Sequence, residues 1–304
     1  GYLFGLSTAA ATALQAGGKV ILLRRFHPRD VLEAFQKHGV TVYHGVPTMY
    51  SMMMEYCEQR DLKFDLSATR LLICSGAPLP DEVGARFISQ FRKPLQNYYA
   101  MTEATPIFGR YHDDPTDLPQ GAIGRAAPGA TIRIKRPDGT ECGVDEPGEA
   151  FVRGAATVKR YAKDEELTKA SLEGGLFRTG DLVSRDAAGF YHIVGRIKEI
   201  IIRGGHNISP AEVEKTMVAH PAVQEAAVVG ISDRIFGEVP VAYVVLRAGM
   251  TATPDELIAF LEPRLSEFKV PRTIYMESAL PQGKTGKVDK AALKARAEQA
   301  ADAA

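Results

Sequence analysis

The sequence has few cysteines, no excess of either charge and no long apolar run. Its three cysteines, Cys57, Cys74 and Cys142, are far apart and form no Cys-x-x-Cys pair, which argues against a zinc site and predicts a reducing, cytoplasmic location. Lysine plus arginine and aspartate plus glutamate each total 37, so the net charge favours neither nucleic acid nor an anionic membrane as a partner. Gln15 and Lys19 interrupt the early apolar segment, and no stretch reaches the roughly 18 apolar residues of a transmembrane segment.

The remaining composition is that of an ordinary globular protein. The 304 residues are 45% hydrophobic and 24% charged, which is enough chain for two or three domains with a sizeable core. The chain starts at Gly1, inside an apolar segment, rather than at a methionine. We therefore expect that an N-terminal portion is missing.

Residues 1–120 carry alternating helical and strand patterns. Short β-branched runs predict buried strands, and the segments between and after them predict helices. The strands are expected at 19–23, 40–43 and 70–74, and the helices at 30–37 and 47–60. This spacing favours an α/β layer with a mostly parallel sheet. Ligand loops of such sheets lie beyond the carboxyl ends of the strands, where residues 75–78 would fall.

Residues 121–197 and 198–304 follow other patterns. The former has short alternating strands with turns and indicates a β-rich subdomain. The latter has the pattern of an α+β domain. Its sequences that begin at Ser209 and at Thr253 are each expected to cap the start of a helix. Strands are expected at 131–135, 149–153, 225–231, 239–247 and 273–277, with a hairpin over 182–194. The predicted fold class is α/β, with a partial layered sheet, then a β-rich subdomain, then a small α+β C-terminal domain.

Thr102 and Glu103 follow Tyr98 and Tyr99 at the expected end of a strand. A hydroxyl beside a carboxylate can bond a phosphate oxygen and hold Mg²⁺, which takes hard oxygen ligands. A surface Thr-Glu pair that opens a helix would have the same sequence, because an acid there favours the helix dipole. Tyr99 could stack on a purine or simply pack at the strand end.

Asp181 follows Thr179-Gly180 in a tight turn, and Arg196 comes after the expected hairpin. A carboxylate in such a turn can accept hydrogen bonds from both ribose hydroxyls, and a guanidinium suits phosphate and ribose oxygens. An Asx-turn aspartate and a hairpin-edge arginine are the structural alternatives. Gly204 and Gly205 either permit close approach of the backbone to a ligand or form a plain β-turn.

Lys287 lies in the turn-rich segment 280–288, just before a predicted helix. Alone, such a segment is a solvated basic loop. A positioned cation can also stabilise charge at a phosphate under attack, a task that needs a cation more than a proton acceptor. A Walker motif is excluded, because Ser278 stands where that motif requires a glycine five residues before Gly283-Lys284.

Together these segments resemble the adenylate-forming superfamily, which contains acyl-CoA synthetases, luciferases and peptide-synthetase adenylation domains. The resemblance covers essentially the whole chain. It rests on Tyr-x-Met-Thr-Glu at 99–103, Arg-Thr-Gly-Asp at 178–181, Gly-Arg-x-Lys and Gly-Gly-x-Asn-Ile-x-Pro-x-Glu-Val-Glu between 195 and 214, and Gly-Lys at 286–287. The segment 204–210 is closer to CoA ligases than to peptide-synthetase domains, which favour an arginine-bearing version.

The resemblance implies an ATP-dependent carboxylate–CoA ligase that forms an acyl-adenylate and pyrophosphate, then passes the acyl group to the CoA thiol. ATP/AMP, Mg²⁺ and coenzyme A are the implied cofactors. The implied catalytic residues are Lys287, Thr102 and Glu103. By motif position, the nucleotide would be held by Gly76, Ala77, Pro78 and Tyr99 at the adenine, Thr102 at the phosphate, Glu103 through Mg²⁺, Asp181 at the ribose diol and Arg196 at the ribose or phosphate.

The resemblance further implies that the C-terminal domain rotates between two half-reactions. Lys287 would orient the acid and the α-phosphate during adenylation, and Lys198 would be the hinge about which 198–304 rotates. Rotation would bring the Gly204-Gly205 loop to the pantetheine channel. Residues 1–197 would be the C-terminal portion of the large AMP-binding domain.

The implied acyl pocket is mostly apolar, which favours an aliphatic or aromatic carboxylic acid. Its residues would be Tyr2, His44, Val46, Met101, Pro106 and Ile107. Arg110 could pair with a second carboxylate, although a solvated loop arginine fits the sequence as well. Ala100 stands where the family usually has glycine, and its methyl group would narrow the pocket.

One family feature is absent from the sequence, and two other functions stay open. The Ser/Thr/Gly-rich loop that cradles pyrophosphate is missing. We therefore expect this chain to be the C-terminal part of a larger synthetase, without about 200 N-terminal residues. We expect that the chain does not adenylate alone. The chain could instead be an adenylation domain that loads a pantetheine carrier protein. It could also be a non-catalytic module that binds an acyl-adenylate.

Overall fold

The computed structural model describes residues 4–77, 79–109, 119, 121–283 and 287–302. The chain divides into two compact units. Unit 1 comprises Gly1–Thr179 and Ser184–Ile193, and unit 2 comprises Gly180–Val183 and Val194–Ala304. Unit 2 therefore takes in the middle of one strand as well as the C-terminal third. The domain boundary expected between residues 197 and 198 stays a prediction.

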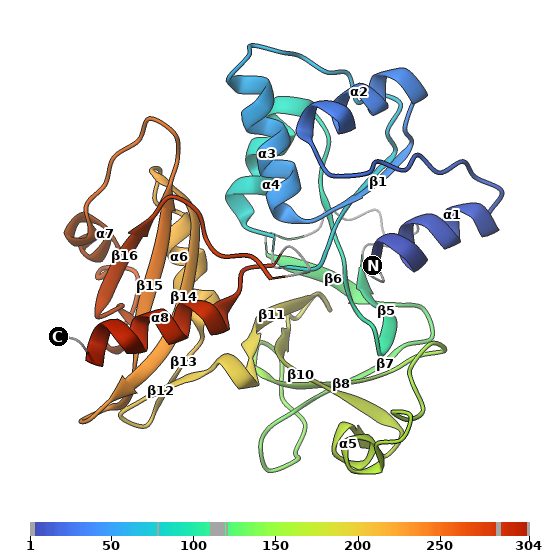
Figure 1. Cartoon of the computed structure of the whole chain (residues 1–304). Coiled ribbons are helices and arrows are strands. Elements are labelled where there is room, and N and C mark those ends of the chain that lie inside the picture. Colours follow the sequence, from blue (N-terminus) through green and yellow to red (C-terminus); the bar gives the residue numbers. More distant parts are fainter. Residues whose placement is uncertain (1–3, 78, 110–118, 120, 284–286, 303–304) are drawn as a thin grey trace. The chain divides into compact units, whose positions relative to one another are not determined.

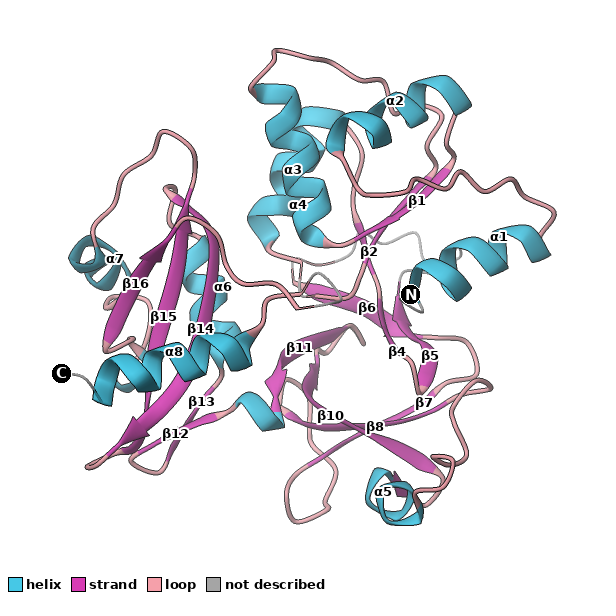
Figure 2. Cartoon of the chain, in the orientation of Figure 1, coloured by secondary structure: helices cyan, strands magenta, loops and turns pink. Residues whose placement is uncertain are grey.

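The first part of unit 1 is a small parallel sheet with helices packed on it (Figures 1 and 2). The strands are β1 (Val42–Gly45), β2 (Leu71–Cys74) and β3 (Gln96–Asn97), and both neighbouring pairs are parallel. The helices are α1 (Thr12–Gln15), which continues a π-helical segment over Phe4–Ala11, α2 (Pro28–His38), α3 (Pro47–Glu58) and α4 (Asp81–Phe91). Leu32, Met53 and Phe87 bring α2, α3 and α4 into one buried core. The predicted α/β layer is confirmed.

The strand predicted at 19–23 is wrong. Residues 18–23 adopt no regular structure, and Leu22 is 82% exposed. In the described part of the chain, β1 has β2 as its one neighbour and no strand lies beside 19–23. A β-branched run favours a strand only where a neighbouring strand supplies the cross-strand packing.

The second part of unit 1 belongs to an eight-stranded sheet in the order β4-β5-β6-β11-β10-β8-β7, with β9 beside β10. The strands are β4 (Tyr99–Met101), β5 (Ala104–Gly109), β6 (Ala122–Ala126), β7 (Thr131–Lys135), β8 (Gly148–Arg153), β9 (Leu172–Glu173), β10 (Leu176–Arg185) and β11 (Tyr191–Arg196), and helix α5 spans Glu165–Ser171. The β10–β11 hairpin turns where Asp186 accepts the Phe190 N–H at 2.8 Å and Gly189 adopts φ 86°. The predicted β-rich subdomain and its hairpin are confirmed.

Unit 2 is a five-stranded sheet with helices on both faces. Its strands are β12 (Ile201–Arg203), β13 (His206–Ile208), β14 (Val223–Asp233), β15 (Gly237–Leu246) and β16 (Thr273–Glu277), in the order β13-β12-β15-β14 with β16 parallel to β15. Its helices are α6 (Pro210–Val218), α7 (Pro254–Leu261) and α8 (Lys290–Asp302). Met217 and Leu257 bury α6 and α7 against one side of the sheet core, whereas Leu293 and Ala297 bury α8 in a separate core.

The two predicted helix caps in unit 2 have different outcomes. Thr253 and Glu256 form a complete capping box at the start of α7. Ser209 precedes α6 as expected but makes no side-chain cap. Its hydroxyl instead donates to the Val194 carbonyl oxygen at 2.5 Å. A hydroxyl has one proton to donate, and here it ties the start of α6 to the end of β11.

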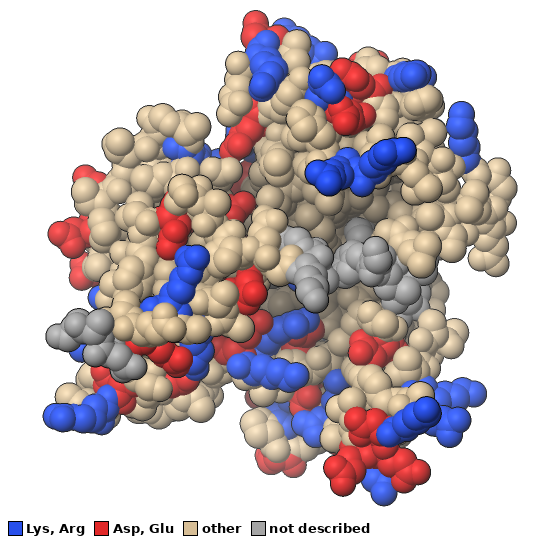
Figure 3. All heavy atoms as spheres, in the orientation of Figure 1, with Lys and Arg blue, Asp and Glu red and all other residues tan. Residues whose placement is uncertain are grey.

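The protein surface carries both signs of charge. On the face drawn in Figure 3, lysine and arginine side chains are interspersed with aspartate and glutamate, in keeping with their equal totals. Among the described residues, every helix is too short or too polar to span a bilayer.

Candidate active site

Asp181 and Arg196 form an ion pair within unit 2. Asp181 lies in β10 and Arg196 is the last residue of β11, and the Arg196 Nε lies 2.7 Å from the Asp181 Oδ1. The Asp181 side chain is 2% exposed, whereas that of Arg196 is 55% exposed. The hairpin thus holds a buried carboxylate at its base and an arginine that reaches solvent.

Lys287 lies in the electrostatic field of this pair. Burial and the like charge of Arg196 lower the pKa of Lys287, while Asp181 and Glu199 oppose that shift. Lys287 nevertheless remains accessible to solvent. Its carbonyl oxygen accepts the Gly283 N–H at 2.8 Å. Three residues predicted from separate motifs are therefore brought together in one unit.

Thr102 and Glu103 occupy the tight turn between β4 and β5 in unit 1. Thr102 is exposed, and Glu103 accepts a hydrogen bond from the Tyr161 hydroxyl at 3.1 Å. Burial and the Glu103 charge raise the pKa of Tyr161. Sequence reasoning missed Tyr161, because it lies 58 residues from Glu103 and no local pattern marks it.

The chemistry of this turn fits Mg²⁺. Glu103 and Thr102 offer hard oxygen atoms, which this ion prefers. Among the described residues, no group of three or more His, Cys, Asp or Glu side chains could hold a metal ion. Mg²⁺ commonly keeps several waters and takes one or two carboxylates plus substrate phosphates, so one glutamate is a sufficient protein ligand.

The other predicted nucleotide residues lie on turns, except Tyr99, which begins β4. Gly76, two residues after the end of β2, adopts φ 88° and is followed by the exposed Ala77. Pro78 is outside the described residues. Tyr99 is half-buried, with its ring centroid 5.4 Å from that of Phe108. In unit 2, the β12–β13 turn is formed by Gly204 and Gly205 at φ 55° and 83°, and Lys198 is exposed in a 3₁₀ turn, Ile197–Glu199.

The predicted acyl-pocket residues are dispersed through unit 1. His44 lies in β1, half-buried, and burial lowers its pKa. Val46 follows β1, and Met101 ends β4; both are half-buried. Ile107 in β5 is only 2% exposed. Tyr2 and Arg110, and the side chain of Pro106, are outside the described residues.

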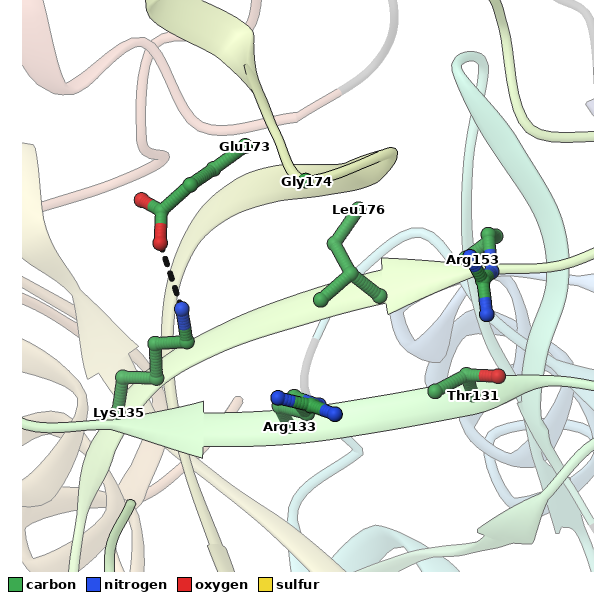
Figure 4. A pocket seen from close by; sticks show the side chains of 7 residues that line it. All are labelled: Thr131, Arg133, Lys135, Arg153, Glu173, Gly174 and Leu176. Carbon is green, nitrogen blue, oxygen red and sulfur yellow. Dashed lines mark hydrogen bonds and ion pairs between the residues drawn. The ribbon is translucent and has the colours of Figure 1, made fainter. Parts of the chain in front are cut away.

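A shallow basic pocket of about 180 Å³ lies on the β7–β8 hairpin and contains none of the predicted site residues (Figure 4). It is lined by Thr131, Arg133, Lys135, Arg153, Glu173, Gly174 and Leu176. Two of its three cations are already neutralised, because Lys135 lies 2.6 Å from Glu173 and Arg133 lies 3.3 Å from Glu141. These ion pairs give it the character of an ordinary charged surface.

Comparison with known proteins finds two family models in this chain. The model described as AMP-binding enzyme matches residues 2–162, and the model described as AMP-binding enzyme C-terminal domain matches residues 212–287. A feruloyl-CoA synthase from Amycolatopsis sp is 36% identical over 294 residues. That match covers 96% of this chain and 59% of the synthase, so the chain spans little more than half the length of this relative.

Two solved structures extend the comparison. The crystal structure of ATP-bound MatB from Rhodopseudomonas palustris matches with a TM-score of 0.90 and 32% identity, over 98% of this chain and 58% of that one. The o-succinylbenzoate CoA synthetase MenE from Bacillus subtilis, in complex with the acyl-adenylate intermediate OSB-AMP, matches with a TM-score of 0.81 and 31% identity, over 95% of this chain and 58% of that one. The expected fold is confirmed by these neighbours.

Proposed function

The chain belongs to the family of AMP-binding enzymes, and on that premise we propose that it is part of an ATP-dependent carboxylate–CoA ligase. The reaction would join a carboxylic acid to ATP, giving an acyl-adenylate and pyrophosphate, and then transfer the acyl group to the thiol of CoA. The observation that carries this proposal is the grouping of Asp181, Arg196 and Lys287 in one unit. Relatives named as CoA synthases over most of this chain support it.

The residues of this grouping fit an adenylate. The buried Asp181 carboxylate would accept hydrogen bonds from the ribose hydroxyls, because an ionised acceptor held away from water makes strong bonds to donors. Arg196 would reach a ribose or phosphate oxygen through its exposed guanidinium. Lys287 would place a positive charge at the α-phosphate, where negative charge develops as the carboxylate attacks.

The β4–β5 turn would contact phosphate groups of ATP. Thr102 would donate its hydroxyl proton to a phosphate oxygen, and Glu103 would hold Mg²⁺, which when bound neutralises charge on the departing pyrophosphate. The Tyr161 hydroxyl would fix the Glu103 carboxylate in orientation. Gly76, Ala77, Pro78 and Tyr99 would frame the adenine.

Transfer to the thiol would follow a rotation of the C-terminal domain about Lys198. The turn at Gly204 and Gly205 has no side chains and would let the pantetheine arm approach the backbone closely. A carrier protein bearing pantetheine offers the same thiol, so acceptor specificity is tested by supplying free CoA and such a carrier side by side. The cytoplasmic location likewise stays a prediction.

The proposed acid is aliphatic or aromatic. His44, Val46, Met101, Pro106 and Ile107, together with Tyr2, would form its pocket. Burial lowers the pKa of His44 and therefore favours the uncharged imidazole, which does not attract a second carboxylate. The relative named for feruloyl-CoA makes ferulate a first choice within a panel of acids.

The decisive experiment uses the full-length gene product. We expect ATP–pyrophosphate exchange that depends on the acid, and AMP release that rises when CoA is added. Lys287→Ala should depress exchange steeply and leave thioester formation from pre-made acyl-adenylate nearly intact. Lys294→Ala, on an exposed face of α8 with Glu238 3.4 Å away, is the control and should change neither. Absence of acid-dependent exchange in the full-length protein would favour the non-catalytic binding module.

A further inference from the structure

We propose that Lys290 is a positioning residue that fixes the Lys287 turn to the hinge segment through Glu199 and Glu214. This inference rests on the proposed function for its catalytic consequence. The coupling of Lys290 to the charge state of Lys287 is independent of that function, because it can be measured in a protein without enzymatic activity.

Lys290 joins three separate elements of unit 2. It is the first residue of α8, and its Nζ lies 2.7 Å from the Glu199 Oε2 in the 3₁₀ turn and 2.8 Å from the Glu214 Oε1 in α6. The side chains of Lys290, Glu199 and Glu214 are 28%, 36% and 19% exposed. Charge-assisted hydrogen bonds this short and this sheltered are stronger and more directional than surface pairs.

One of the two carboxylates is itself fixed to the sheet. The Glu214 Oε1 accepts the Val228 N–H at 2.8 Å, and Val228 in β14 is fully buried. Lys290 is thereby anchored, through Glu214, to strand β14. Glu199 follows the predicted hinge residue Lys198, so the same ammonium links the hinge segment to this anchor.

The Lys287 turn is attached to that anchor on its C-terminal side. Asp289 accepts the Ala292 N–H at 3.0 Å and so caps α8, and its own N–H donates to the Pro281 carbonyl at 2.8 Å. Lys287 lies three residues before Lys290, and its carbonyl oxygen accepts the Gly283 N–H. Movement of Lys290 would therefore be passed to Lys287 through a short, hydrogen-bonded stretch.

The charges of this cluster are coupled. Burial acts to lower the pKa of Lys290, but Glu214 and Glu199 together raise it above its usual value. Glu199 also acts on Lys287 and opposes the lowering of its pKa. Removing the Lys290 ammonium would leave Glu199 without its close counter-charge, and its pull on Lys287 would increase.

The same helix provides a contrast. Lys294 lies one turn after Lys290, and its Nζ is 3.4 Å from Glu238 and 4.0 Å from Glu298. Its side chain is 44% exposed. Pairs of that kind contribute little, because solvent screens them. Lys294 is therefore a matched control for loss of one lysine from α8.

The test compares Lys290→Met, Lys290→Arg and Lys294→Met in the full-length gene product. The pKa of Lys287 is measured by competitive amine labelling with mass spectrometry. Lys290→Met should raise it, whereas Lys290→Arg and Lys294→Met should leave it unchanged. If Lys290→Met does not fold, Glu199→Gln provides the opposite change, a lower pKa of Lys287. An unchanged pKa of Lys287 in a folded Lys290→Met or Glu199→Gln variant would overturn the proposal.

The catalytic consequence is read from the two half-reactions. Misplacing a catalytic group by about 1 Å can cost about 100-fold in rate, so Lys290→Met should lower kcat for adenylation by about 10- to 100-fold. The KM for ATP and thioester formation from pre-made acyl-adenylate should change little, and Lys290→Arg should restore most of the rate. Equal loss in both half-reactions, or no rescue by arginine, would contradict positioning. A wild-type protein that does not adenylate refutes the proposed function, while labelling still decides the role of Lys290.

Discussion

Asp181 is almost fully buried beside Arg196, which is mostly exposed, although the two form one 2.7 Å ion pair. The two partners are therefore not equivalent. The aspartate side chain lies in the protein interior, and the arginine side chain is in contact with solvent. This asymmetry suits a site in which the acid stays fixed and the cation adjusts to the bound nucleotide.

The first prediction concerns Asp181→Asn. The amide keeps the size of the side chain but loses its charge, so it weakens hydrogen bonds from ribose hydroxyls and the pairing with Arg196. Hydrogen bonds to charged groups contribute about 1.5–3 kcal/mol, so binding of a stable acyl-sulfamoyl adenosine should weaken about 10- to 100-fold. Isothermal titration calorimetry on the full-length protein measures this affinity.

Asp186→Asn is the control for that measurement. Asp186 supports the tip of the same hairpin, where it accepts the Phe190 N–H and lies 3.1 Å from the His192 Nε2. Its substitution should lower thermal stability without changing affinity for the adenylate analogue. Equal losses of affinity in both variants would show that the hairpin, rather than the Asp181 charge, determines binding.

The second prediction is an alkaline limit on adenylation. Lys287 must be protonated to carry charge, and burial together with Arg196 lowers its pKa. As pH rises through that lowered pKa, the cation is lost, so the adenylation rate should fall at a lower pH than an ordinary lysine would allow. Lys287→Arg keeps its charge throughout the accessible range. Its pH–rate profile should therefore lack this limb, even if its maximal rate is lower.

The candidate site residues could be named from the sequence because they occur in short, ordered motifs, and their roles stay predictions. Local patterns identify these residues, because Thr102 and Glu103 are adjacent in the sequence and Asp181 directly follows Thr179-Gly180. Tyr161 and Lys290 could not be predicted in this way, because their partners lie in distant elements. The Lys290–Glu199 pair, for example, joins residues 91 positions apart.

Secondary-structure elements with a local sequence signal were predicted correctly, whereas predictions that depend on distant neighbours were not. Strands β7 and β16 follow from alternation within five residues, and α7 from its own capping box. The run at 19–23 has the same local composition as a strand, but a strand also depends on its neighbour. Ser209 has the sequence of a cap, but its hydroxyl is directed to the Val194 carbonyl and accepts no hydrogen bond from the first turn of α6.

The third prediction tests the hydrogen bond from Ser209 to Val194 near the end of β11. A Cβ added at Gly195 would lie 2.7 Å from the Ser209 Oγ, so Gly195→Ala must displace the hydroxyl and break its bond to Val194. Loss of such a bond costs about 1–2 kcal/mol. In a Ser209→Ala background that bond is already gone, and Gly195→Ala should then cost little. Urea denaturation of the two single variants and the double variant measures the coupling, and additive losses would contradict it.

The fourth prediction concerns close approach of two strands in unit 1. Gly124 in β6 adopts φ 105°, and a Cβ there would overlap the carbonyl group of Gly109 in β5. Gly124→Ala therefore combines an unfavourable backbone conformation with a clash against backbone that cannot rotate away, and should cost more than about 3 kcal/mol. Urea denaturation, or loss of soluble protein, measures this change.

Substitutions at two other glycines distinguish backbone strain from steric clash as causes of that loss of stability. Gly129 also has positive φ, at 77°, but a Cβ there would meet nothing within 4 Å, so Gly129→Ala should cost about 1 kcal/mol through backbone strain alone. Gly154 has neither a positive φ nor a neighbour within 4 Å of such a Cβ, and Gly154→Ala should be nearly neutral. If Gly124→Ala cost no more than Gly129→Ala, the strands would have room to separate, and the tight β5–β6 contact would not be required for the sheet.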